Sequence, residues 1–76
     1  MTDKQWVKDA EKAFLGKTIV GVRYMTQAEC DEMGWRSRPL VLALNDGNLI
    51  WPSRDDEGND AGALFCNDEP GCFPVL

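Results

Sequence analysis

The sequence contains no histidine, and this absence argues against several familiar kinds of catalytic or metal site. A serine or cysteine nucleophile usually needs a neighbouring imidazole, and a structural zinc site usually needs histidine or paired Cys-x-x-Cys ligands. The three cysteines, Cys30, Cys66 and Cys72, form no such pair. No glycine-rich loop opens a helix that would hold phosphate. We therefore expect a protein that is not an enzyme and that carries no cofactor.

Long hydrophobic runs are also missing. The longest apolar segments, 19–22 and 39–44, are far shorter than the roughly 20 residues of a transmembrane helix. The first residues lack the apolar middle region of a secretory signal. We expect a cytoplasmic protein with no membrane partner and with reduced thiols. A bridge between Cys66 and Cys72 is sterically conceivable, because a turn-like stretch separates them.

Positive charge is absent from the last third of the chain. All eight Lys and Arg lie at or before Arg54, acidic residues continue to Glu69, and the formal net charge is −5. Because phosphate contacts need Lys and Arg, we expect no nucleic-acid partner for this part. Lys4, Lys8 and Lys12 recur beside Asp and Glu, which favours a solvated helix face over a basic binding stripe.

The hydrophobic fraction of 43% in 76 residues is enough for one compact domain. Apolar residues at helical spacing predict an amphipathic helix over 3–15 that ends before Gly16. The β-branched run 18–24 predicts a strand, in which Gly21 permits a bulge or the close approach of another element. A capping-box pattern, Thr26-Gln27-Ala28-Glu29, predicts a second helix over 27–33. Met25 and Cys30 are expected to form its hydrophobic staple, and Gly34 to end it.

The strongest local pattern is a hairpin over 39–51, because the Asp46-Gly47 pair suits a two-residue turn. This turn would place Leu40, Leu42, Leu44, Leu49 and Trp51 on one face and Val41, Ala43 and Ile50 on the other. The predicted pairs are Leu44 with Leu49, Ala43 with Ile50, and Leu42 with Trp51. Pro52 then ends the strand or marks it as an edge.

A polar loop over 53–62 and two C-terminal strands, 63–66 and 72–76, complete the prediction. The expected fold class is α+β, in a single domain over residues 1–76. It consists of a small antiparallel sheet of three to five strands with an N-terminal helix and a short second helix.

Two hypotheses for function follow from these patterns. A hairpin that is apolar on both faces needs two covers, which favours a non-enzymatic interaction module and, in one form of the hypothesis, a homodimer formed through the sheet. The expected interaction residues are Val41, Ile50, Trp51 and Arg54. Its partner would be a second copy, another protein or a small molecule.

The alternative is a small-ligand or divalent-cation site on the acidic loop. Its candidate oxygen ligands are Asp55, Asp56, Glu57, Asn59 and Asp60. Their order differs from that of an EF-hand, and a solvated loop whose charges pair with arginines is the simpler interpretation. A ligand pocket would be rimmed by Trp51 and Arg54.

The stretch from Gly16 to Phe65 also carries a distinctive layout of motifs. A Gly-x-x-Ile-x-x-Val-Arg pattern begins at Gly16, the Asp-Gly hairpin follows, and Asp-Asp-Glu-Gly-Asn-x-x-Gly-Ala-Leu-Phe ends at Phe65. In this layout the chain resembles a group of small uncharacterised prokaryotic proteins. The resemblance implies a prokaryotic protein of this kind, and it implies no activity and no ligand residue.

Overall fold

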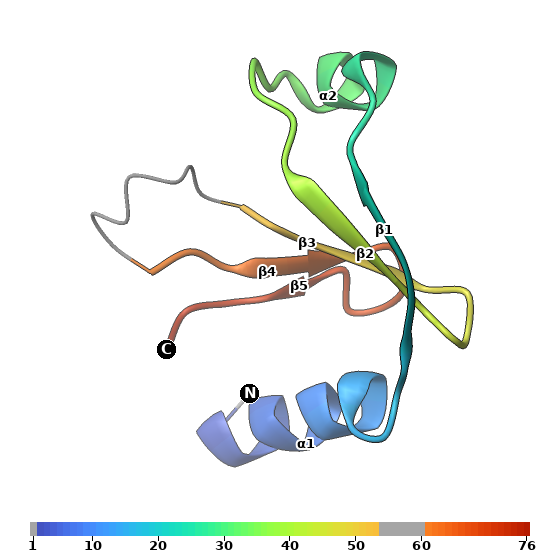
Figure 1. Cartoon of the computed structure of the whole chain (residues 1–76). Helices are drawn as coiled ribbons and strands as arrows, with labels where there is room; N and C mark the ends of the chain where they lie inside the picture. The colour runs from blue at the N-terminus through green and yellow to red at the C-terminus, as the bar shows by residue number, and fades with distance from the viewer. Residues whose placement is uncertain (1, 54–60) are drawn as a thin grey trace.

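The structure is a computed structural model that describes residues 2–53 and 61–76, and within them it has two helices and five strands (Figure 1). The strands lie in the sheet in chain order, and every neighbouring pair is antiparallel. The predicted α+β class, with a small antiparallel sheet and the N-terminal helix first, is confirmed. The elements are α1 (Asp3–Phe14), β1 (Ile19–Tyr24), α2 (Gln27–Met33), β2 (Leu40–Leu44), β3 (Leu49–Pro52), β4 (Leu64–Cys66) and β5 (Cys72–Phe73).

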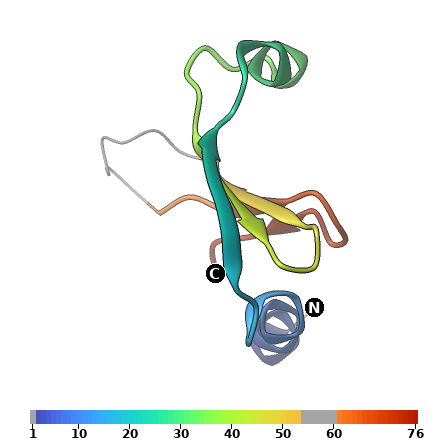
Figure 2. The same cartoon turned by 45° about the vertical axis from the view of Figure 1, so that its right-hand side comes forward.

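Helix α1 ends one residue earlier than predicted and is held to the sheet by aromatic side chains. The helix begins with a capping box that was not predicted. The Thr2 side chain accepts a hydrogen bond from the Gln5 N–H, and the Gln5 side chain accepts one from the Thr2 N–H. No described residue of α1 is buried. The rings of Trp6 and Phe14 lie 6.2 and 5.0 Å from the ring of Phe73 in β5. These ring contacts fix α1 beside the sheet, at the opposite end of β1 from α2 (Figures 1 and 2).

Helix α2 forms as its sequence predicts. Its capping box joins Thr26 and Glu29, and Gly34 ends the helix in the left-handed conformation with φ 74°. Met25 and Cys30 pack together with Val41 of β2, so the expected staple is part of a hydrophobic core. The chain after α2 returns to this core through Trp35, and Leu49 and Trp51 pack against it from β3.

The hairpin between β2 and β3 forms, but the predicted register is wrong by one residue. Leu42 pairs with Ile50 and Ala43 with Leu49, and the Leu44 N–H donates to the Asn48 carbonyl over 2.9 Å. The loop therefore has three residues, 45–47, instead of two. Trp51 lies on the Val41 face, and Ile50 lies on the Leu42 face, because a one-residue shift moves every side chain to the other face.

The reason lies in the backbone of the turn. A two-residue Asp-Gly turn of type I′ needs positive φ at both positions, whereas only glycines have positive φ among the described residues. Gly47 has φ 89°, and its N–H donates to the Leu44 carbonyl. Asn45 is fixed from outside the hairpin, because its N–H donates to the Thr18 carbonyl and its side chain accepts from the Thr18 N–H. Contact with Thr18, the residue before β1, therefore favours the longer loop.

Two structural predictions about the C-terminal half have clear outcomes. Pro52 ends β3, which is a central strand between β2 and β4 and not an edge. Cys66 and Cys72 are free thiols. Because Cys72 pairs with Phe65, the residue next to Cys66, the two cysteines point to opposite faces of the sheet. The register therefore prevents the bridge that their spacing made conceivable.

Candidate interaction surface

The acidic loop proposed from the sequence as a cation site falls outside the described residues. Arg54 and the candidate ligands Asp55, Asp56, Glu57, Asn59 and Asp60 all lie there. In residues 2–53 and 61–76, no three or more Cys, Asp or Glu side chains come together as metal ligands. The cation site stays a prediction, which a calorimetric titration with calcium, magnesium and manganese tests.

The three described residues of the predicted interaction surface do not lie together. Val41 is 2% exposed and belongs to the core beneath α2. Ile50 is half-buried on the opposite face of the sheet. Trp51 is half-buried, its ring lies 6.3 Å from that of Phe65, and its buried Nε1 has no hydrogen-bond partner in the described part of the chain. Val41, Ile50 and Trp51 therefore pack on the two faces of the sheet and do not form one shared exposed surface.

The exposed apolar surface is concentrated on β1 instead. Ile19, Val20, Val22 and Tyr24 are 53%, 64%, 64% and 61% exposed. Single exposed apolar residues are ordinary, but a contiguous group of them is typical of an interaction site. The neighbouring Leu40 of β2, which pairs with Tyr24, is also exposed. We call these five residues the β1 surface.

The β1 strand is also an edge of the sheet. In the described part of the chain it pairs with β2 on one side, and its other side carries no strand (Figure 2). The Met25 N–H donates to the Pro39 carbonyl over 2.9 Å, and the same register continues through Tyr24, Arg23 and Val22. Hydrogen-bonding residues alternate along an antiparallel pair. The backbone groups of Arg23 therefore point to β2, and those of Val22 and Tyr24 point to the open side, where the Tyr24 carbonyl accepts a hydrogen bond of 3.2 Å from the Arg23 guanidinium.

A bulge interrupts the beginning of this edge. The register shifts between Ile19 and Gly21, so Val20 is the extra residue. A Cβ added to Gly21 would lie 3.3 Å from the Cβ of Ala43, which explains why glycine stands at this close approach. The close approach predicted for Gly21 is observed, and the bulge lies at the neighbouring Val20. The regular, open part of the edge is 22–24.

The one charge on β1 is neutralised within the chain. The Arg23 guanidinium donates to both carboxylate oxygens of Glu29 over 2.9 and 3.1 Å, which ties β1 to the start of α2. Hydrogen bonds from Arg23 and from the Thr26 backbone N–H lower the pKa of Glu29 to about 2. The β1 surface is therefore apolar and has a compensated charge beside it.

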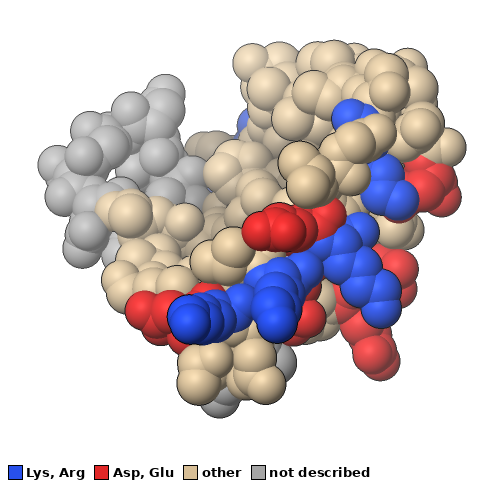
Figure 3. Space-filling model, turned by 90° about the horizontal axis from the view of Figure 1, so that it is seen from below, with Lys and Arg blue, Asp and Glu red and all other residues tan. Residues whose placement is uncertain are grey.

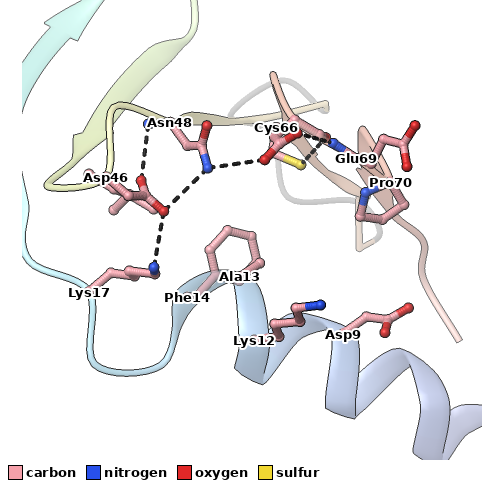
Figure 4. A pocket seen from close by; sticks show the side chains of 12 residues that line it. Asp9, Lys12, Ala13, Phe14, Lys17, Asp46, Asn48, Cys66, Glu69 and Pro70 are labelled. Atoms are coloured by element: carbon pink, nitrogen blue, oxygen red, sulfur yellow. Dashed lines mark hydrogen bonds and ion pairs between the residues drawn. The ribbon is translucent and has the colours of Figure 1, made fainter.

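A second candidate is an open groove of about 570 Å³ between α1 and the loops after β2 and β4 (Figure 4). Several of the polar side chains on its loop side bind one another. Lys17 lies 3.1 Å from an Asp46 carboxylate oxygen, and the Asn48 side chain donates to both Asp46 and Asp68. Hydrogen bonds from the Asn48 N–H and from Lys17 lower the pKa of Asp46. This network joins the end of α1 to two loops, which is a structural role.

The surface seen from the side of α1 carries both signs of charge close together (Figure 3). Lys and Arg lie next to Asp and Glu instead of forming a separate basic region. This distribution agrees with the solvated-face interpretation of the α1 lysines. Within the described residues, neither helix has the length and apolar character to cross a bilayer.

The β1 surface was not predicted from the sequence. The sequence did carry a signal for it. Ile19, Val20 and Val22 are apolar at both odd and even positions, whereas a strand with one buried face alternates apolar and polar residues. What the sequence did not give was the position of this strand at an edge of the sheet.

Comparison with known protein families, with curated proteins and with solved structures gives no match. The resemblance to small prokaryotic proteins therefore stays a prediction. The geometry of the described residues therefore carries the functional argument, and its most distinctive feature is an apolar strand at the edge of the sheet.

Proposed function

We propose that this chain is a non-catalytic interaction module that binds another polypeptide strand along the edge of β1. The observation that carries the proposal is that Val22 combines a largely exposed side chain with backbone N–H and C=O groups directed to the open side of the sheet, beside the exposed side chain of Tyr24. An added strand would satisfy the backbone groups and cover part of the exposed side chains. Strand addition of this kind is a common mode of peptide recognition.

β1 lacks lysine and proline, and it carries two other features that protect edges, the bulge at Val20 and the charge of Arg23. That charge is paired with Glu29, so the apolar Val22 is the part of the edge that an added strand would reach. In the groove beside α1, Lys17, Asp46 and Asn48 already bind one another.

Site-specific photo-crosslinking in living cells tests the proposal. A benzophenone side chain replaces Tyr24 in one variant and Val7, an exposed residue of α1, in the control variant. We expect a discrete adduct from position 24 and none from position 7. Adding Val22→Lys should abolish the adduct, because a lysine on an edge opposes strand pairing. No adduct at position 24, or an adduct that survives Val22→Lys, would refute the proposal.

A further inference from the structure

We draw no further inference here: the strongest candidate, the exposed apolar β1 surface at the open edge of the sheet, belongs to the site already described, and nothing in residues 2–53 and 61–76 shows what covers it.

Discussion

Replacing Phe73 by leucine should release α1 from the sheet before the rest of the domain unfolds. Phe73 is a buried residue of β5, and the rings of Trp6 and Phe14 approach it from α1 at 6.2 and 5.0 Å. Helix α1 has twelve residues and buries none of those described. Isolated helices of about 12–15 residues or fewer are marginal in water, so α1 depends on this contact.

The expected loss follows from the two ring contacts. Each aromatic pair contributes about 0.5–1.5 kcal/mol beyond burial, so Phe73→Leu should lower the free energy of opening α1 by about 1–3 kcal/mol. A loss of about 2 kcal/mol would accelerate amide exchange in α1 about 30-fold. Phe73→Ala would cost about 3–5 kcal/mol. This is a large share of the total stability of about 4–11 kcal/mol for a domain of this size, so leucine is the sharper probe.

Native-state hydrogen exchange measured residue by residue gives the readout. Phe65→Leu is the matched control. The Phe65 ring lies 5.9 and 6.3 Å from the rings of Trp35 and Trp51. Phe65 pairs with Trp51 in the sheet, and both lie on the face opposite to that of Phe73. This control should lower the global stability and leave the separate opening of α1 unchanged. Equal exchange of α1 in the two variants would show that Phe73 does not hold the helix.

The remaining predictions concern the charge beside β1 and the hairpin loop. Because hydrogen bonds from Arg23 and from the Thr26 N–H lower the pKa of Glu29 from 4.5 to about 2, these contacts contribute full stability above pH 4.5 and lose it as the pH falls toward 2. Urea unfolding at a series of pH values should show this loss, and Glu29→Gln, which keeps a capping amide, should show less of it; an identical pH dependence would contradict the assignment. Gly47→Ala should lower the free energy of unfolding by about 1–2 kcal/mol, because φ is 89° at this position. Gly47→Asn should cost less in the same urea experiment, and equal costs would argue against the left-handed loop.

Local signals in the sequence predicted the helices well. The capping box at Thr26 and Glu29, the staple of Met25 with Cys30 and the stop at Gly34 all appear in the structure. Each depends on residues within a few positions of one another, so no distant contact is needed to specify it. The capping box at the start of α1 was readable in the same way and was overlooked.

The register of the hairpin shows where local reasoning fails. Asp46-Gly47 favours a two-residue turn by itself, but Asn45 is held by Thr18, which lies 27 residues earlier in the chain. That contact exists only when β1 has docked on β2. Its consequence reaches the core, because the shift by one residue brings Trp51 to the face of Val41.

The candidate site was likewise predictable in part from the sequence and in part only from the tertiary structure. The apolar character of residues 19–24 is written in the sequence, and so is the lone charge of Arg23. The exposure of these residues cannot be predicted from the sequence. It depends on β1 lying at one edge of the sheet and on α1 packing against Phe73 near the other edge.

The sequence by itself determined which segments are helical or extended, because hydrophobic period, caps and turn residues act over a few neighbouring positions. Only the tertiary structure decided the strand order, the loop length and the face to which each strand residue points. These depend on contacts between segments far apart in the chain, and in a sheet a shift of one residue reverses which side chains are buried.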